Sequence, residues 1–385
     1  MTARRSLLSA ATLGALLAPH VLAAQTRSGA TTPGAASNTS TGSGLPMNAP
    51  RTGGRWRPPH RLGLGGQPLS NGFGKVVSDE TAIDVMNAAW DAGTRLYDTS
   101  PWYTLGRGER RMGQVLSSKP RDEFVLATKV GRLLNPDREL GLRRVANWAD
   151  APPFRHVFDY TADGTRRSIE DSLQRMGLSR IDIVFVHDLS PSTRDLPGND
   201  WRAQFEIARR GAFPTLARMK EEGIIKAWGM GVNDPEPITA ALEVAEPDIF
   251  LAATQYSLAD HAKALDGIIP AIQAKGASIM VGAPLNGGFL SGRDRFNYGG
   301  SIPAAMAEKR EKMLRVARNH GVDLRVAALH FLNASPVVSC FVPGASSPEQ
   351  PRQNAEAFRT TIPAAFWAEM RAEGLVDQRA PLPQT

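Results

Sequence analysis

The sequence predicts an α/β fold, a closed (β/α)8 barrel, over residues 59–385 of the 385-residue chain. From residue 60 onward, short apolar runs alternate with longer amphipathic segments, and eight such strand–helix units follow one another. This alternation predicts parallel strands covered by helices, and eight units in roughly 300 residues fit a barrel. A doubly wound sheet is the alternative fold, but its GxGxxG turn is missing, because RLGLGGQPLSNGFG lacks that spacing.

The expected strands are short Val-, Ile-, Leu- and Phe-rich runs, and the expected helices show a 3.6-residue apolar period. Strands are expected at 61–66, 95–100, 123–131, 181–188, 224–232, 248–256, 277–285 and 337–344. Helices are expected at 80–93, 109–118, 161–177, 213–223, 235–245, 263–276, 304–321 and 347–358. Gly93 and Gly177 mark two helix ends, because glycine readily adopts the left-handed conformation that stops a helix.

Two long polar segments, 132–160 and 189–204, follow the third and fourth expected strands. Loops after barrel strands overhang the rim where barrel enzymes hold their active sites, so these segments are candidates for a substrate pocket. Their large aromatic residues either line that pocket or pack the loops onto the barrel. These residues are Trp148, Phe154, Phe158 and Trp201.

Residues 1–24 predict an export signal. Arg4 and Arg5 precede an Ala-, Leu- and Gly-rich run that stays uncharged as far as Gln25. The run is shorter than the ~20 residues of a membrane span, so we expect no stable membrane insertion. The arginine pair ahead of SLL is typical of a bacterial twin-arginine signal, and an ordinary secretory signal is the alternative. Periplasmic location and the twin-arginine export machinery as a partner follow as expectations.

Residues 25–58 are rich in Gly, Ser, Thr, Ala and Pro and show no apolar periodicity. This composition predicts a disordered linker between the export signal and the barrel. Within it, Trp56 either docks on the barrel or stays in solvent.

The charge of the chain is concentrated near its start. The net charge is +7, but residues 1–78 hold eight basic and no acidic residues, which leaves 37 basic and 38 acidic residues beyond them. The expected barrel is therefore not basic, which argues against a nucleic-acid partner. The single cysteine, Cys340, excludes a disulfide framework, and the seven histidines form no HxH or HExxH motif, so no metal is expected.

Four polar residues with complementary chemistry lie at or just after consecutive expected strands: Asp98, Tyr103, Lys129 and His187. Each alone has a structural explanation, as a loop cap, a rim aromatic, a solvated lysine or a core histidine. Together, at the strand ends where barrel enzymes carry their chemistry, they form a candidate active site.

The flanking sequences resemble those of the aldo-keto reductases over residues 60–360, approximately. The matching motifs are DTSPWYTLGRGE from Asp98, ATKVG around Lys129, FVHD around His187, and MGVND, ATQYS, GAPLNGGFL and VPGASSPEQPRQN further on. The opening LGLGGQPLSN and AWDAGTRLYDTSPWY are most similar to the aldose and fucose dehydrogenase-like members of that family.

The resemblance implies a role for each candidate. Tyr103 is the proton donor in carbonyl reduction and the base in alcohol oxidation, since a phenol with an ordinary pKa near 10 needs help to ionise. Lys129 is expected to lower that pKa, and Asp98 to keep the lysine charged and oriented. His187 holds the substrate oxygen, and Trp102 stands at the substrate mouth, where close relatives often carry histidine.

The resemblance also implies a nicotinamide cofactor, NAD or NADP. Asn233 and Gln255 are expected to hold the carboxamide of the nicotinamide, with plain capping of strand ends as the alternative. The other expected contacts follow the seventh and eighth strands, where the glycines alternatively form a tight turn. They are Pro284, Leu285, Gly287, Gly288, Leu290, Ser346, Ser347, Gln350 and Asn354. Segment 344–350 holds no Lys or Arg, with Arg352 as the nearest cation, so the sequence leans toward NAD.

The expected function is an NAD(P)-dependent oxidoreductase that interconverts a sugar hemiacetal or alcohol with its lactone or carbonyl by direct hydride transfer. Reduction of other small aldehydes, of the pyridoxal type, is one alternative. A non-catalytic module that binds nicotinamide nucleotides is another, and the presence of all four candidate residues argues against it.

Overall fold

The computed structural model describes residues 44–384 except residue 51. The predicted export signal at 1–24 and the linker residues 25–43 lie outside the described residues.

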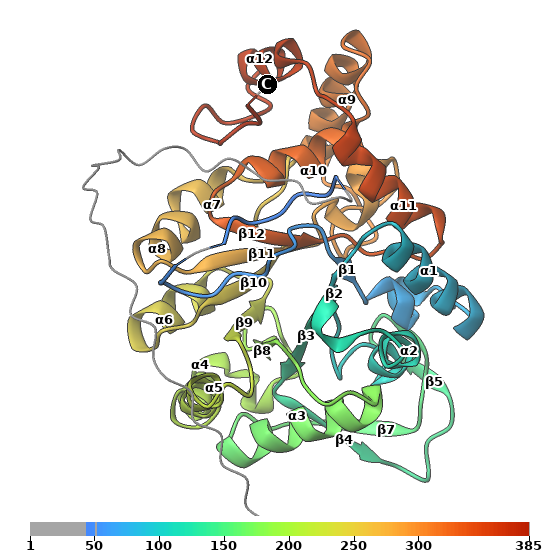
Figure 1. The fold of residues 1–385 in the computed structure, drawn as a ribbon, viewed down its shortest axis with the longest axis vertical. Coiled ribbons are helices and arrows are strands. Elements are labelled where there is room, and N and C mark those ends of the chain that lie inside the picture. Colours follow the sequence, from blue (N-terminus) through green and yellow to red (C-terminus); the bar gives the residue numbers. More distant parts are fainter. Residues whose placement is uncertain (1–43, 51, 385) are drawn as a thin grey trace, which may run out of the picture. The chain divides into compact units, whose positions relative to one another are not determined.

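Eight parallel strands form the centre of the structure, in the chain order β1-β2-β3-β8-β9-β10-β11-β12. They are β1 (Leu64–Gly65), β2 (Leu96–Asp98), β3 (Val125–Val130), β8 (Ile183–His187), β9 (Ala227–Val232), β10 (Ile249–Ala253), β11 (Ser278–Gly282) and β12 (Val338–Val342). Parallel bridges between Leu62 and Phe341 and between Gly65 and Gly344 join the last strand to the first. The predicted eight-stranded parallel barrel is confirmed (Figure 1).

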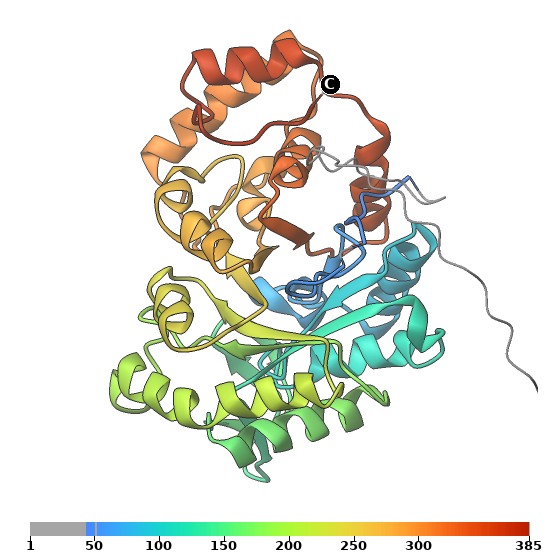
Figure 2. The same cartoon turned by 60° about the vertical axis from the view of Figure 1, so that its left-hand side comes forward.

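Helices surround the strands on the outside (Figures 1 and 2). They are α1 (Asp79–Asp91), α2 (Arg107–Leu116), α3 (Ala162–Met176), α4 (Trp201–Arg210), α5 (Ala212–Glu221), α6 (Glu236–Val244), α7 (Ala262–Asp266), α8 (Ile268–Ala274), α9 (Ala304–Asn319), α10 (Leu324–Ala334), α11 (Glu349–Glu356) and α12 (Ala364–Ala372). Local chemistry sets several ends. The Ser78 side chain caps α1 by accepting from the Thr81 amide, and Gly177, at φ +62°, ends α3.

The strands are buried on both faces, as the apolar runs of a parallel sheet require. All five residues of β8 are buried. One strand face fills the barrel interior with a cluster that includes Leu96, Phe185, Met280 and Cys340. The other face packs against the helices in a larger cluster. This two-sided burial fixes the strand ends, and with them the side chains that follow.

The described part of the expected linker is packed on the barrel. Leu45 is buried, and Met47 pairs with His60 in an antiparallel bridge. Trp56 packs against the interior cluster, and Arg55 donates to the backbone oxygens of Glu246 and Lys275. The structure therefore differs from the predicted disordered linker at residues 45–48 and 55–58, which contact the barrel, whereas residues 49, 50 and 52–54 are exposed.

The long segment after β3 forms two nested antiparallel strand pairs (hairpins) rather than loops, and the inner pair lies within the outer one in the sequence. β4 (Arg132–Pro136) pairs with β7 (Phe154–Phe158), and β5 (Arg143–Val145) pairs with β6 (Trp148–Ala151). They lie outside the eight-stranded sheet (Figure 1). Because β4 starts directly after β3, this arrangement brings the hairpins to the rim where the strands end.

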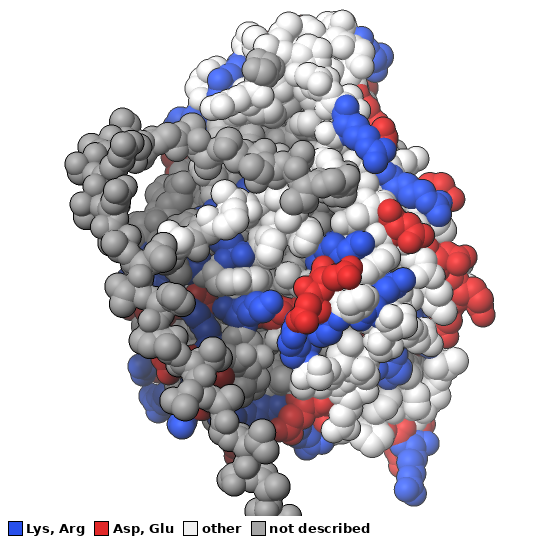
Figure 3. Space-filling view, viewed as in Figure 1, with Lys and Arg blue, Asp and Glu red and all other residues white. Residues whose placement is uncertain are grey.

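None of the helices formed by the described residues is both long and apolar enough to cross a membrane. Acidic and basic side chains are interspersed on the face seen in Figure 3, without a broad patch of one sign. In the same part of the chain, no cluster of three or more His, Cys, Asp or Glu residues could hold a metal ion.

Candidate active site

Asp98 and Lys129 form a buried ion pair at the ends of β2 and β3. The Lys129 Nζ atom lies 2.8 Å from Asp98 Oδ1 and 2.9 Å from Oδ2, and its third proton is donated to the Thr99 carbonyl at 2.7 Å. Both side chains are almost inaccessible to solvent. Every donor of the ammonium is thus used, as a pair of buried charges requires if it is to be stable.

Tyr103 lies directly beside this pair, in the loop after β2. The Lys129 Nζ atom lies over the Tyr103 ring, 4.6 Å from its centroid. Within the described residues, no hydrogen bond joins Lys129 to the Tyr103 hydroxyl, because the three lysine protons point to Asp98 and Thr99.

Burial, and after it the Asp98 carboxylate, raise the pKa of the Tyr103 phenol well above its ordinary value. The expectation that Lys129 lowers the pKa of Tyr103 is therefore wrong for this structure. The physical reason is that the charge of Lys129 is already compensated by Asp98. Tyr103 is consequently a neutral phenol at neutral pH, ready to donate its proton.

His187 is held between the barrel and the neighbouring loops. Its Nδ1 atom lies 3.2 Å from Ser100 Oγ, and its Nε2 atom lies 3.4 Å from Asp188 Oδ1. Burial lowers the pKa of His187 well below its ordinary value, and the charges of Lys129 and Arg132 add to this effect. The imidazole is therefore neutral at neutral pH and carries a single N–H donor.

Three of the four candidates meet at an inner cavity of about 150 Å³. Tyr103, Lys129 and His187 line it, together with Trp102 and Trp148 from the flanking segments. The Trp148 ring centroid lies 5.5 Å from that of Tyr103, so this tryptophan forms a wall of the pocket. The other three aromatics of segments 132–160 and 189–204 do not line this cavity but pack against other side chains.

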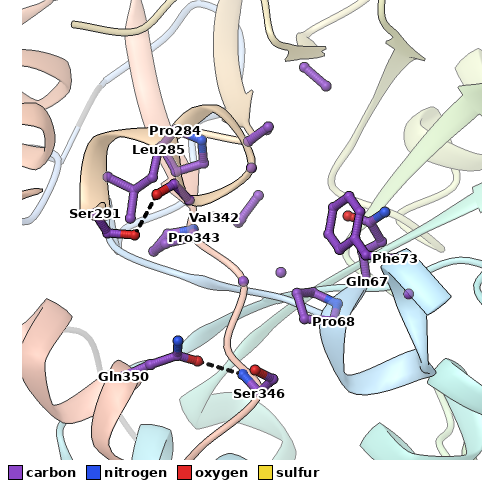
Figure 4. Close-up of a pocket in the computed structure, with 18 of the residues that line it drawn as sticks. Gln67, Pro68, Phe73, Pro284, Leu285, Ser291, Val342, Pro343, Ser346 and Gln350 are labelled. Carbon is purple, nitrogen blue, oxygen red and sulfur yellow. Dashed lines mark hydrogen bonds between the residues drawn. The ribbon is translucent and has the colours of Figure 1, made fainter. Parts of the chain in front are cut away.

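A larger groove of about 530 Å³ also reaches Asp98 and Tyr103 and continues to the start of α11 (Figure 4). Most of the expected cofactor contacts line this groove. They are Pro284, Leu285, Gly287, Gly288, Ser346, Gln350 and Asn354. Gly287 and Gly288 have positive φ angles, and a side chain at either position would collide with the segment that follows. Asn233 lines the inner cavity instead.

Three expected cofactor contacts lie outside the linings of both cavities. Gln255 is turned toward the backbone oxygen of Asn233, to which its Nε2 atom donates. Leu290 is buried in the hydrophobic core. The Ser347 amide donates to the side-chain oxygen of Gln350 at 3.3 Å. The Leu290 side chain therefore faces the core and neither cavity, and a cofactor contact at this position stays a prediction.

The groove carries four cations that sequence reasoning did not identify as ligands: Lys75, Arg293, Arg295 and Arg325. Arg325, on α10, donates to the Gln353 carbonyl at 3.1 Å and lies 3.3 Å from Asn354 Oδ1. Arg352, the cation favoured from the sequence, is exposed and does not line the groove. The sequence did not point to Arg325, because it lies on α10 and outside segment 344–350.

The residues of the groove fit a dinucleotide. Its volume lies within the range of ligand clefts, and its arginines suit phosphate groups. At the start of α11, the Ser346 amide donates at 2.6 Å to the Gln350 side-chain oxygen, which shows that this amide points to an acceptor inside the groove (Figure 4). A phosphate oxygen can take the same position.

Sequence reasoning also missed Gln67, Asn147, Asp188 and Tyr298, which line the inner cavity. Gln67 and Tyr298 line the groove as well, so they stand where the two spaces meet. The FVHD motif could have pointed to Asp188, since it directly follows His187. No periodicity or motif places Tyr298 near Tyr103, because about 200 residues separate them.

Comparison with known proteins agrees with this geometry. Residues 61–373 match the model of the aldo/keto reductase family. The chain is 36% identical to D-threo-aldose 1-dehydrogenase from a Pseudomonas species, over 82% of this chain and 94% of that one. It is 36% identical to pyridoxal 4-dehydrogenase from Microbacterium luteolum, with the same two coverages.

Solved structures show the same fold. An aldo-keto reductase from Bacillus halodurans in its holo form superposes with a TM-score of 0.60 at 24% identity, covering 85% of this chain and 94% of that chain. The glycerol dehydrogenase of Gluconobacter oxydans also gives 0.60, at 21% identity and with the same coverages. The resemblance expected from the motifs is thereby confirmed, and the chain belongs to the aldo/keto reductase family.

Proposed function

We propose that the protein is an NAD(P)-dependent oxidoreductase that interconverts a sugar hemiacetal and its lactone, or an alcohol and its carbonyl, by direct hydride transfer. The observation that carries this proposal is the position of Tyr103. Its phenol is shared by an inner cavity that also contains His187 and by a groove that fits a dinucleotide. The similarity to D-threo-aldose 1-dehydrogenase supports a sugar substrate.

NAD(P), when bound in the groove, supplies or accepts the hydride. The chain provides the proton and positions the substrate. In reduction, the N–H of neutral His187 holds the carbonyl oxygen, and Tyr103 donates its proton to that oxygen as the carbon gains hydride. In oxidation, the carbon loses hydride, and Tyr103, after losing its own proton, takes the proton of the substrate hydroxyl.

The Lys129–Asp98 pair is proposed to hold the Tyr103 ring in place. The ammonium lies 4.6 Å from the ring centroid, close enough for a cation–π contact that fixes the ring. Asp98 fixes the ammonium with two hydrogen bonds and prevents it from donating elsewhere.

Reduction or oxidation of a pyridoxal-like aldehyde is a second candidate. It is favoured by the equal similarity to pyridoxal 4-dehydrogenase and by the two tryptophans, Trp102 and Trp148, that line the inner cavity. A flat aromatic aldehyde would pack well against such rings. A purely nucleotide-binding module is disfavoured, because such a protein has no need of a buried ion pair beneath Tyr103.

Both NAD and NADP are proposed as cofactors. The preference for NAD expected from the sequence depends on the absence of Lys and Arg from segment 344–350. Arg325 lines the same end of the groove from α10 and offers a positive charge to a 2′-phosphate.

Export to the periplasm by the twin-arginine route is also proposed. The support is the Arg4-Arg5 pair, together with the need for a folded barrel before a cofactor can bind at its rim. Replacing both arginines by lysine is expected to leave uncleaved precursor in the cytoplasm, because the export machinery reads the identity of the pair. Normal export and cleavage of that double variant would instead support an ordinary secretory signal.

The function is tested by following nicotinamide absorbance with purified protein, NAD or NADP, and panels of aldoses, pyridoxal and small aldehydes. We expect substrate-dependent turnover in at least one panel, and none with the Tyr103→Phe variant. If wild-type protein binds cofactor but turns over no member of any panel, the proposed oxidoreductase function is contradicted.

A further inference from the structure

The inner cavity contains a negatively charged side chain that the chemistry above does not use. Asp188 is the one acidic residue among the lining residues that the structure describes there. It directly follows His187 at the end of β8, and its amide donates to the Gly231 carbonyl at 2.9 Å. An ionised carboxylate accepts hydrogen bonds and cannot donate them. Its position in a small cavity beside the proton donors therefore suits a ligand group that donates a hydrogen bond.

The backbone of Asp188 is in an unusual conformation. Its φ angle is +49°, in the left-handed region that side-chain-bearing residues seldom adopt. Such strain persists where the surrounding structure enforces it, and it is frequent at ligand-binding positions. Here the conformation allows Asp188 to stay paired to β9 through its amide while its carboxylate lines the cavity.

A second residue holds the carboxylate in place. The Arg132 guanidinium donates to Asp188 Oδ2 at 2.9 Å and is itself buried. It lies over the rings of Trp102 and Phe158, 4.6 Å from each centroid. Arg132 is the first residue of β4, so the first hairpin fixes the position of the Asp188 carboxylate.

The other carboxylate oxygen remains available to a ligand. Asp188 Oδ1 lies 3.4 Å from His187 Nε2, which is too long for a strong hydrogen bond. Its side chain keeps 16% of its surface exposed, although its partner Arg132 keeps only 3%. An oxygen at this place can accept a hydrogen bond from a substrate group next to the oxygen that His187 holds.

We propose that Asp188 Oδ1 accepts a hydrogen bond from a substrate hydroxyl on the carbon adjacent to the reacting carbon, which selects α-hydroxy aldehydes and aldoses that carry a 2-hydroxyl. This inference rests on the proposed function. His187 and Tyr103 hold the reacting oxygen, so the neighbouring acceptor faces the next substituent along the substrate. A buried carboxylate that finds no donor is unfavourable. A substrate that lacks the hydroxyl is therefore expected to have a kcat/KM about 10- to 100-fold lower.

The test compares one aldose with its 2-deoxy analogue, using wild-type protein and Asp188→Asn. Asparagine tolerates a positive φ angle and keeps an oxygen that accepts from Arg132, so this variant is expected to fold. We expect wild type to prefer the 2-hydroxy sugar in kcat/KM by at least about tenfold, and Asp188→Asn to reduce that preference to less than about threefold. The variant's kcat/KM should fall by a larger factor on the 2-hydroxy sugar than on the 2-deoxy sugar.

Asp188→Gly, which also tolerates the backbone angle, repeats the test without any acceptor. Asp195→Asn is the matched control, because Asp195 is a half-exposed acid that contacts His156 and does not line the cavity. It should leave the preference unchanged. Thermal unfolding and cofactor affinity of each variant confirm that the protein remains folded.

Three outcomes would overturn the inference. Equal kcat/KM of wild type for both sugars would show that no acceptor reads the 2-hydroxyl, while leaving the proposed function intact. An equal loss on both sugars in Asp188→Asn would show a general effect on His187 rather than selection. Turnover of neither sugar, while other carbonyl compounds are turned over, would exclude sugars as substrates and distinguish this failure from that of the enzyme itself.

Discussion

The inner cavity and the groove differ in how the fold holds them. Asp98, Lys129 and His187 come from strands of the closed barrel and are buried, and their neighbours leave them little freedom. The groove is walled mainly by the segment after β11, the turn after β1 and the start of α11, together with a few strand residues such as Gly65 and Val342. Strands thus position the three residues around Tyr103, which itself lies in the loop after β2, and loops form much of the surface that is expected to bind the cofactor.

This difference separates two kinds of variant. Changes in the inner cavity are expected to lower turnover while cofactor affinity stays near normal. Changes in the groove are expected to weaken cofactor binding while the proton chemistry is preserved.

Tyr103→Phe removes the transferable proton and keeps the ring between Lys129 and Trp148. We expect kcat to fall by about 10³- to 10⁴-fold, at the upper end of what general acid–base catalysis contributes. Cofactor affinity, measured by fluorescence titration, should change by less than about threefold. Turnover within a few-fold of wild type would remove Tyr103 from the proposed role.

Lys129→Met leaves Asp98 buried without its partner. We expect kcat to fall by about 10²-fold or more and the free energy of unfolding to fall by about 3–5 kcal/mol, because an unpaired buried charge is costly. Denaturant unfolding measures the second effect. Adding Asp98→Asn should restore stability but not turnover, which separates the structural part of the pair from its action on Tyr103.

The pH dependence of oxidation follows from the raised pKa of Tyr103. Oxidation needs the ionised phenol, so its rate should rise with pH and show no plateau near neutral pH, by about tenfold per unit between about pH 7 and about pH 9. Reduction needs the neutral phenol and should stay nearly constant over that range. A plateau of the oxidation rate already at pH 7 would show that the phenol ionises far more easily than its burial implies.

Arg325→Gln tests the groove. We expect NADP affinity to fall by about tenfold and NAD affinity to change by less than about threefold, because the guanidinium can pair with the 2′-phosphate that only NADP carries. Arg352→Gln is the control, since Arg352 is exposed and does not line the groove. Calorimetric titration measures both. Equal losses for the two cofactors would assign Arg325 to a group that they share.

The same difference between strands and loops explains which features of the fold and the site could be predicted from the sequence. The eight strands and the positions of Asp98, Lys129 and His187 follow from local apolar runs and from the rule that strand ends meet at one rim. The hairpins after β3 were not predicted, because their strands are short and only partly apolar. The contribution of Arg325 could not be predicted either, because it depends on how α10 and α11 pack.

The direction of the pKa shift of Tyr103 could not be predicted from the sequence either. The presence of a lysine near Tyr103 suggested a lowered phenol pKa, but the outcome depends on where the three lysine protons point. They point to Asp98 and Thr99, and the phenol is buried, so the pKa of Tyr103 rises. Likewise, Leu45 and Trp56 are embedded in a polar segment, and only their contacts with the barrel show that it is folded.

The most direct test of the proposed chemistry follows the hydrogen itself. An aldose carrying deuterium at C1 is incubated with the purified protein and NAD or NADP, and the reduced cofactor and the sugar product are analysed by mass spectrometry and NMR. We expect one deuterium atom in each reduced nicotinamide and a lactone without deuterium at C1, as direct hydride transfer requires. Appearance of the deuterium in solvent, with an unlabelled reduced cofactor, would contradict direct transfer between the inner cavity and the groove.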